Sequence, residues 1–217
     1  MTDYFCENNN YCIIMDYING EDIQKIIDNS NDFLDVNRVV EWMMDVLRTL
    51  GYIHSQKIIH RDIKPGNIKI DDSNRAILID FGIPKDYNKM LTAPGARGAF
   101  TPYMASPEQC QACGQTTPAS DIYSVGATLY YCLTLGYPTD AISRVMGKPV
   151  TNPQQINPNI SHELSQIIMK AISINATDGF QTAREFLKEL LKWKNVNQNK
   201  TNNQYIQKNT NKHLDGI

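Results

Sequence analysis

The sequence has little net charge, no long apolar run and few cysteines. Its 21 lysines and arginines nearly balance its 23 aspartates and glutamates, which gives a formal charge of −2. This balance provides no broad positive field, so it argues against a nucleic-acid-binding or membrane-binding protein. No apolar stretch approaches the roughly 20 residues that cross a bilayer, and the start MTDYFCENNN does not resemble a secretory signal. We therefore expect a cytoplasmic protein without a membrane span.

The five cysteines are an odd and scattered set, which argues against a disulfide framework. Reduced thiols are the expected state. Cys110 and Cys113 form one C-x-x-C pair, which could indicate a redox pair or half of a zinc site. No second pair and no suitably spaced histidine follow it in the sequence, whereas a structural zinc site requires four ligands. We therefore interpret the pair as part of a polar loop.

The length of 217 residues suffices for one domain with a sizeable core and a tail. Beyond Trp193 the sequence is rich in Asn, Gln and Lys and has scarcely an apolar residue. This composition cannot bury a core of its own. Residues 194–217 are therefore predicted to be a disordered tail.

Helical patterns dominate the rest of the chain. Apolar side chains recur at three- and four-residue steps from Val36 to Ile53, which predicts a long core helix with Asp35 as its N-cap. Residues 120–135 are apolar nearly all round, so this helix is expected to be buried on every side. Further predicted elements are a strand at 11–15, a short helix at 21–29, short strands at 58–60, 67–70 and 76–80, and helices at 161–173 and 182–193 capped by Ser161 and Thr182.

Three motifs follow one another at the ends of the short strands: HRDIKPGN at 60–67, DFG at 80–82 and TPYMASPE at 101–108. An irregular segment separates the last two, and a loop of that length inside a compact domain is usually functional. Together the motifs resemble the catalytic loop, the metal-binding motif and the activation-segment end of the eukaryotic-type protein kinases. MDYING at 15–20 resembles their hinge between two lobes, and DIYSVGATLY at 121–130 resembles the buried helix of their lower lobe.

This resemblance implies a mainly α-helical fold with a few short strands, in which 19–193 form a protein-kinase-like C-terminal lobe. Residues 1–18 are then a remnant of the N-terminal lobe strands and the hinge. Such kinases also use a Gly-rich phosphate loop and a strand lysine paired with a helix glutamate. This sequence contains no such motifs. We therefore expect a truncated N-terminal lobe and an isolated chain that binds Mg·ATP weakly and turns over slowly.

The resemblance also implies how the motif residues transfer the γ-phosphate of ATP to a serine or threonine hydroxyl of a protein. Asp62 would accept or orient the proton of the hydroxyl, and Lys64 would contact the γ-phosphate. Asn67 and Asp80 would hold Mg²⁺, which prefers hard oxygen ligands. A lysine two residues after the catalytic aspartate is typical of the serine/threonine kinases.

An adenine site at the hinge follows from the same resemblance. Met15 would be the gatekeeper, and the backbone of Asp16 and of Ile18 would form hydrogen bonds with adenine. Lys69 stands where an apolar side chain often forms the floor of the pocket. We expect its methylene stem to take that place, with the ammonium turned outward.

Other residues of the motifs would support this site. Phe81 and Gly82 would pack and turn the backbone so that the metal-binding aspartate faces the nucleotide. Asp121 would be the buried acid that holds the backbone of the catalytic loop. His60 would be a packing residue rather than a base, and the remaining histidines, His54 included, are assigned to surface or capping roles.

The activation segment has its own predicted residues. Arg61 would pair with a phosphate on this segment, and Thr92 is the candidate acceptor of that phosphate. Thr101 would line the pocket beside the substrate hydroxyl. Glu108 lacks the arginine that usually pairs with it in the family, so it would pair with another cation, such as Arg184, or stay solvated.

Three functions are compatible with these observations. The first is an ATP-dependent serine/threonine protein kinase. The second is a non-catalytic kinase-like module that binds a partner through its helical face and its C-x-x-C loop. The third is a gene fragment whose N-terminal lobe is encoded upstream or supplied by a separate, activating partner. Retention of the four catalytic and metal-binding residues favours the first. The missing lysine–glutamate pair favours the other two.

Overall fold

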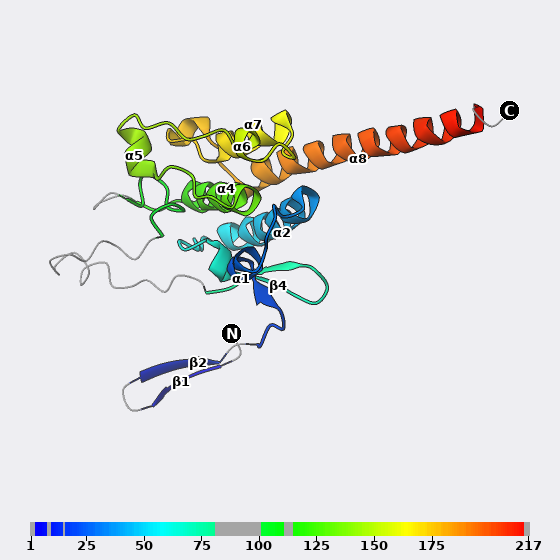
Figure 1. The fold of residues 1–217 in the computed structure, drawn as a ribbon. Helices are drawn as coiled ribbons and strands as arrows, with labels where there is room; N and C mark the ends of the chain where they lie inside the picture. Colours follow the sequence, from blue (N-terminus) through cyan, green and yellow to red (C-terminus); the bar gives the residue numbers. More distant parts are fainter. Residues whose placement is uncertain (1–2, 8–9, 15, 81–100, 111–114, 215–217) are drawn as a thin grey trace.

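The computed structural model describes residues 3–7, 10–14, 16–80, 101–110 and 115–214. Two small antiparallel sheets and layers of helices make up these residues (Figure 1). The first sheet is a hairpin in which β1 (Asp3–Glu7) pairs with β2 (Asn10–Ile14), and Figure 1 shows it apart from the helical layers. β2 confirms the predicted strand at 11–15 to within one residue.

The second sheet lies beneath the helices and has β4 (Ile68–Ile70) between β3 (Glu21–Asp22) and β5 (Ala76–Leu78). Alternate residues of β4 and β5 are buried in the core, as a strand with one covered face requires. Lys69 lies at the centre of β4, opposite Asp22 and Ile77. Its side chain therefore leaves the sheet on the face that does not enter the helical core.

The predicted strands at 67–70 and 76–80 are confirmed to within two residues. The one predicted at 58–60 is wrong, because this segment is not a strand. The backbone N–H groups of His60 and Arg61 bind the carboxylate of Asp121 instead of a neighbouring strand. A side chain distant in sequence thus takes the hydrogen bonds that a sheet would have used.

Two helices form the centre of the fold. α2 (Val36–Ser55) is the predicted long core helix, and Asp35 caps it by accepting from the N–H of Arg38 at 2.7 Å. α4 (Pro118–Thr134) packs against α2, and every residue from Ser120 to Thr134 is buried. The prediction of a helix buried on all sides is therefore confirmed.

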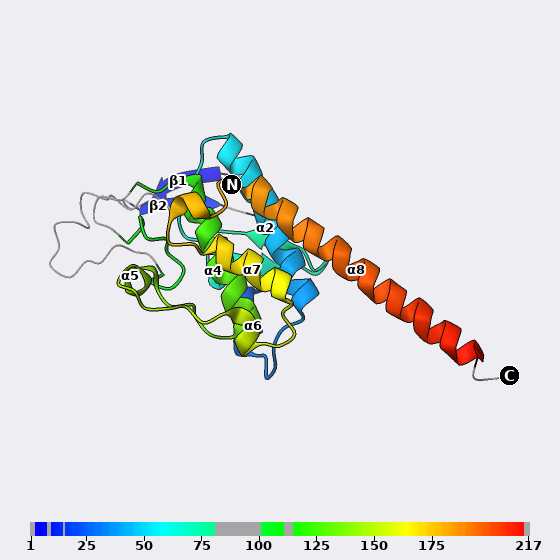
Figure 2. The same ribbon diagram turned by 90° about the horizontal axis from the view of Figure 1, so that it is seen from above.

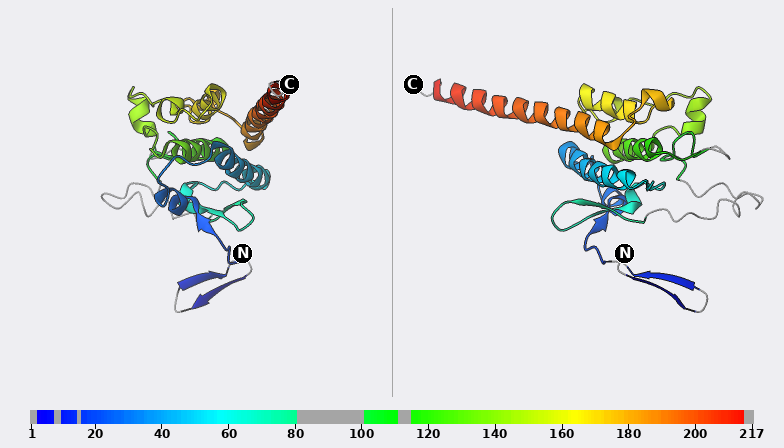
Figure 3. Two further views of the ribbon diagram at one scale, coloured as in Figure 1. Left: turned by 45° about the vertical axis from the view of Figure 1, so that its right-hand side comes forward. Right: turned by 180° about the vertical axis from the view of Figure 1, so that it is seen from behind.

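Further helices flank this pair, and Figure 3 shows them in layers above the small sheet. Ser161 caps α7 (His162–Ala171) by accepting from the N–H of Leu164 at 3.2 Å, as predicted. Thr182 caps α8 (Ala183–Leu214) in the same way, by accepting from the N–H of Glu185 at 3.1 Å. None of the described helices has the length and apolar content that a membrane crossing needs. The remaining helices and 3₁₀ turns are α1 (Ile23–Asp28), η1 (Pro65–Asn67), α5 (Ala141–Val145), α6 (Pro153–Ile156) and η2 (Ala176–Asp178).

α8 continues to Leu214 and extends away from the other helices (Figure 2), whereas the sequence predicts a disordered tail from residue 194. Its first turns are fixed by packing. Trp193 is buried and donates its indole N–H to Ser161 at 2.9 Å, and Lys194 pairs with Glu41 at 2.6 Å. Each residue added to an existing helix gains a hydrogen bond without a new nucleus, so a polar sequence can prolong it. The composition of the segment did not reveal this continuation.

Gly126 of α4 packs closely against the end of α7. A Cβ atom at this position would come within 2.6 Å of the Ala171 Cβ and 3.1 Å of Ile172 Cγ2. Gly126→Ala is therefore expected to lower the free energy of unfolding by about 1–3 kcal/mol through overpacking.

Gly51 of α2 provides the matched control, because no heavy atom lies within 4 Å of its Cβ position. Gly51→Ala is expected to raise the free energy of unfolding by about 0.5–1 kcal/mol, since alanine favours the helix. Urea unfolding followed by circular dichroism measures both variants. Equal stabilities would contradict the close packing at Gly126.

Candidate active site

The HRDIKPGN segment brings three polar side chains together. Asp62 Oδ2 accepts from Lys64 Nζ and from Asn67 Nδ2, both at 2.9 Å. Asn67 Nδ2 also donates to the backbone carbonyl of Asp62 at 2.7 Å. The 3₁₀ turn η1 begins with Pro65, and it turns the chain so that Asn67 returns to Asp62. Three of the predicted site residues therefore form one cluster.

Asp80 follows β5 and is connected to this cluster through the backbone. The N–H of the preceding residue, Ile79, donates to the Asn67 carbonyl at 2.9 Å, and His60 Nε2 lies 3.1 Å from the Ile79 carbonyl oxygen. Asp80 itself is exposed and has a φ of 55°, in the left-handed region that few non-glycine residues adopt. Such strained conformations concentrate at functional sites.

The residues present fit a magnesium ion. The Asn67 amide nitrogen makes both hydrogen bonds to Asp62, which leaves its carbonyl oxygen as a ligand atom, and Asp80 offers an exposed carboxylate. Mg²⁺ commonly takes one or two protein oxygens and completes its shell with water and phosphates. No group of three or more His, Cys, Asp or Glu side chains could hold a metal within the described ranges. The Asn67–Asp80 pair is therefore the candidate.

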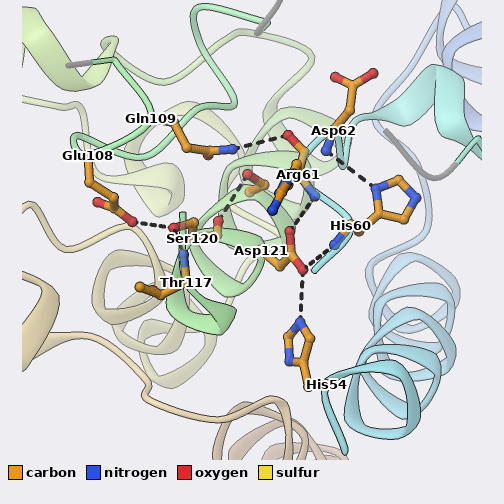
Figure 4. A network of polar contacts seen from close by, with 10 residues as sticks. His54, His60, Arg61, Asp62, Glu108, Gln109, Thr117, Ser120 and Asp121 are labelled. Carbon is orange, nitrogen blue, oxygen red and sulfur yellow. Dashed lines mark hydrogen bonds and ion pairs between the residues drawn. The ribbon is translucent and has the colours of Figure 1, made fainter. Parts of the chain in front are cut away.

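The carboxylate of Asp121 holds the backbone of the HRDIKPGN segment at His60 and Arg61 (Figure 4). Its side chain is 1% exposed. Oδ2 accepts from the N–H of His60 at 2.8 Å and lies 2.8 Å from His54 Nε2, and Oδ1 accepts from the N–H of Arg61 at 2.8 Å. Arg61 has a φ of 72°, so these bonds hold the loop in a strained conformation next to Asp62.

His54 belongs to this network, so its assignment to a surface or capping role is wrong. Its side chain is only 10% exposed, in the last turn of α2. It follows Leu50 by four residues and therefore lies on the buried face of the helix. The helical spacing contained this signal, but nothing in the sequence identified Asp121 as the partner.

His60 is fully buried beneath the loop. Burial lowers its pKa, although the negative charge of Asp121 opposes that effect. The imidazole is therefore neutral at pH 7. Its Nδ1 lies 3.4 Å from the N–H of Asp62, and its Nε2 contacts the backbone before Asp80. The ring therefore connects the backbone at Asp62 with the backbone that leads to Asp80.

Glu108 is anchored by a hydroxyl rather than by a cation. Ser120 Oγ donates to Glu108 Oε1 at 2.5 Å and accepts from the N–H of Thr117 at 3.0 Å (Figure 4). Arg184 and Glu108 are both described, and no ion pair joins them. The suggested pairing with Arg184 is therefore wrong. Ser120 was not foreseen, because its partner lies in a loop whose path the sequence does not reveal.

Gln109 is a second unforeseen anchor of the same segment. Its Nε2 donates to the carbonyl of Arg61 at 3.1 Å, and its Oε1 accepts from both the N–H and the Oγ of Ser106 at 3.1 Å. The end of the TPYMASPE segment is thereby tied to the catalytic loop. Thr101 begins this segment, is half-buried and accepts from two backbone N–H groups through its carbonyl.

The Ser120 hydroxyl provides a test of this anchoring. Ser120→Ala is expected to lower the free energy of unfolding by about 1–2 kcal/mol, because it removes a buried donor from a carboxylate. Ser124 is the control, since its hydroxyl donates to a carbonyl of the same helix at 3.1 Å. Ser124→Ala is expected to cost less than half as much in chemical denaturation. Equal losses would show that the bond to Glu108 does not hold the segment.

Lys69 lies at the predicted adenine site but is not turned outward. Its Nζ donates to the backbone carbonyl of Ile18 at 2.9 Å and lies 5.3 Å from the centre of the Tyr17 ring. Asp16 precedes these residues and is exposed. The ammonium therefore connects β4 to the hinge-like segment.

Several predicted residues fall outside the described ranges: Met15, Phe81, Gly82, Thr92 and Cys113. Of the C-x-x-C pair, Cys110 is a free, half-buried cysteine. Burial raises the pKa of its thiol to about 11, so it is not a reactive thiolate at neutral pH.

The fold and this cluster define a kinase-like lobe, and comparisons with known proteins agree. The chain matches the protein kinase domain family over residues 1–209. It is 31% identical over 194 residues to a probable serine/threonine-protein kinase of Clostridium acetobutylicum, covering 87% of this chain and 29% of the relative. It is 32% identical over 191 residues to the serine/threonine-protein kinase PknB of Mycolicibacterium smegmatis, covering 83% and 30%. The chain belongs to the protein kinase family.

Solved structures support the fold. The crystal structure of the Mycobacterium tuberculosis PknI kinase domain aligns with a TM-score of 0.68 and 22% identity, covering 88% of this chain and 69% of that one. The structure described as the PpkA-294 apo form aligns with a TM-score of 0.73 and 22% identity, covering 87% and 66%. The chain spans only about 30% of the length of the curated relatives.

Proposed function

We propose that this chain carries the catalytic lobe of an ATP-dependent serine/threonine protein kinase that acts on protein substrates in the cytoplasm. The observation that carries this proposal is the hydrogen-bonded cluster of Asp62, Lys64 and Asn67, joined through the backbone to the position of Asp80. A module that only binds a partner needs none of these residues together. Their arrangement in one cluster supports catalysis.

The cluster suggests how the proton and the charges are handled. Lys64 and Asn67 both bind Oδ2 of Asp62, so Oδ1 accepts the hydrogen bond of the substrate hydroxyl and orients it for attack. Phosphoryl transfer depends mainly on positioning and charge neutralisation. The ammonium of Lys64, next to the reacting hydroxyl, offsets negative charge on the phosphoryl group. Mg²⁺ held by Asn67 and Asp80 would neutralise the ATP phosphates.

The hinge-like segment would bind adenine beside the gatekeeper Met15. Lys69 already donates to the carbonyl of Ile18, so the N–H of Ile18 and the carbonyl of Asp16 are the groups without a competing lysine that would bind the base. The methylene stem of Lys69 forms the floor beneath the ring, as proposed for this position, while its ammonium fixes the hinge.

The substrate side of the site would be controlled by the activation segment. Arg61 is exposed next to Asp62, and it would bind a phosphate on Thr92. Thr101 would lie beside the substrate hydroxyl. Phe81 and Gly82 would direct Asp80 toward the nucleotide.

The metal assignment is tested by nucleotide binding. Asp80→Asn is expected to weaken ATP binding at least tenfold in the presence of Mg²⁺ and to have little effect in its absence, because the variant loses the charge that holds the ion. Isothermal titration of the chain with ATP, with and without Mg²⁺, measures this difference. Asp32→Asn, at an exposed position before α2, is the control. Equal Mg²⁺ dependence in the Asp80 variant and the unchanged chain would overturn the assignment.

A further inference from the structure

Lys69 reaches from the small sheet to the hinge-like segment and carries a positive charge to it. Its Nζ donates to the backbone carbonyl of Ile18 at 2.9 Å and lies 5.3 Å from the centre of the exposed Tyr17 ring. Among the described residues, no carboxylate forms an ion pair with this ammonium. The side chain is half-buried, where a charge acts on its neighbours more strongly than in bulk water. A fixed, unneutralised positive charge therefore lies at the Ile18 carbonyl.

The backbone of the hinge-like segment determines which edge of a base meets this charge. Residues 16–19 contain no helix, turn or bend. In an extended chain the N–H and the C=O of one residue point to the same side, and so do those of the residue two positions away. The Asp16 carbonyl, the Ile18 N–H and the Ile18 carbonyl thus present an acceptor, a donor and a second acceptor in a row.

Adenine matches the first two of these groups. Its 6-amino group donates and its N1 accepts, so a base that binds the Asp16 carbonyl and the Ile18 N–H turns its C2–H toward the Ile18 carbonyl. The ring nitrogens on either side of C2 are both acceptors, which a positive charge attracts. An amino group at C2 would instead direct its N–H donors at the oxygen that already holds the Lys69 ammonium, and the two positive ends would repel each other.

We propose that Lys69 is a specificity-determining residue of the adenine site, which accepts purine triphosphates without a donor at C2 and rejects those that carry a 2-amino group. The inference rests on the proposed function, since it requires the hinge-like segment to bind the base of ATP. An apolar side chain at this position could form the floor of the site but has no charge with which to distinguish the two edges. The discrimination comes from a repulsive contact with the wrong base.

Two nucleotides that differ by one group test this role: ATP and 2-amino-ATP, whose base is 2,6-diaminopurine. Both keep the 6-amino donor and the N1 acceptor. Their affinities for the full chain are measured with Mg²⁺ by displacement of the fluorescent analogue TNP-ATP. ATP is expected to bind about three- to tenfold more tightly. Equal affinities, or tighter binding of 2-amino-ATP, would overturn the proposal.

Lys69→Met separates the charge from the floor. The variant keeps an unbranched apolar stem but removes the ammonium, which frees the Ile18 carbonyl to accept from a 2-amino group. The preference for ATP is therefore expected to disappear or reverse. Lys148→Met, at an exposed position after α5, is the control and is expected to keep the preference.

The ratio of the two affinities distinguishes specificity from a structural role. A structural loss in Lys69→Met would weaken both nucleotides equally and leave their ratio unchanged, and that result would also overturn the proposal. If neither nucleotide displaces the probe from the unchanged chain, the proposed function fails and this inference fails with it. Measurable affinities without the expected ratio would overturn the inference alone.

Discussion

Asp121→Ala is expected to lower the free energy of unfolding by about 3–5 kcal/mol, the range measured when one partner of a buried charged network is removed. The Asp121 carboxylate accepts from the N–H groups of His60 and Arg61 and contacts His54. Alanine offers none of these bonds, and the three groups would lie without an acceptor in a region from which water is excluded.

The loss should be concentrated in the catalytic loop. Arg61 has a left-handed backbone that its bond to Asp121 helps to maintain, so the loop is expected to relax when the carboxylate is removed. Chemical denaturation gives the change in stability, and amide hydrogen exchange is expected to show faster exchange at His60 and Arg61. Asp32→Ala, at an exposed position, is expected to change the stability by less than about 0.5 kcal/mol. A loss below 1 kcal/mol in Asp121→Ala would show that the network does not hold the loop.

The second large effect concerns Asp62. Asp62→Asn is expected to lower the rate of phosphate transfer by about 10²- to 10⁴-fold, because an amide cannot accept the proton of the hydroxyl. The side chain is 28% exposed, and an asparagine oxygen can still accept from Lys64 and Asn67, so the fold should be retained.

The division between binding and chemistry distinguishes this role from a structural one. The KM for ATP is expected to stay within a fewfold of its original value, while kcat carries nearly the whole loss. Steady-state rates at varied ATP, with Asp32→Asn as the control, give both quantities. A variant that loses ATP affinity and keeps kcat would indicate that Asp62 positions the nucleotide instead of the hydroxyl.

The contacts of the candidate site could be predicted from the sequence because the members of its cluster are close along the chain. Asp62, Lys64 and Asn67 lie within one loop, so their order and spacing nearly determine their contacts. The central helices were predictable for a related reason, since the helical repeat of apolar residues reports directly on burial. Asp35 and Ser161 were recognisable as caps by their position before such repeats.

The contacts that the sequence did not reveal join residues distant along the chain. His54 binds Asp121, Ser120 binds Glu108 and Gln109 binds the backbone of Arg61. Each involves a polar residue whose partner depends on how segments distant along the chain approach one another in the fold. Local spacing contains no such information. The same reason explains the false strand at 58–60, where a distant carboxylate replaces a sheet partner.

Lys69 is a residue that the sequence singled out but whose contact it did not determine. The sequence singles out Lys69 as an unusual residue at the predicted adenine site, but the chemistry of lysine permits either a solvated ammonium or a hydrogen bond to the nearest carbonyl. The carbonyl of Ile18 lies within reach only because β3 pairs with β4 and brings the hinge-like segment over the sheet. The choice between the two states is therefore made by tertiary structure.

The central claim is that Asp62, Asn67 and Asp80 still support phosphate transfer to a serine or threonine hydroxyl. Its most direct test is the transfer of labelled γ-phosphate from ATP to matched peptides that carry a single serine, threonine or tyrosine. We predict slow, Mg²⁺-dependent labelling of the serine and threonine peptides, little labelling of the tyrosine peptide, and loss of labelling in Asp62→Asn and Asp80→Asn. The claim would be contradicted if the unchanged, folded chain labelled the serine and threonine peptides no faster than the Asp62→Asn and Asp80→Asn variants do.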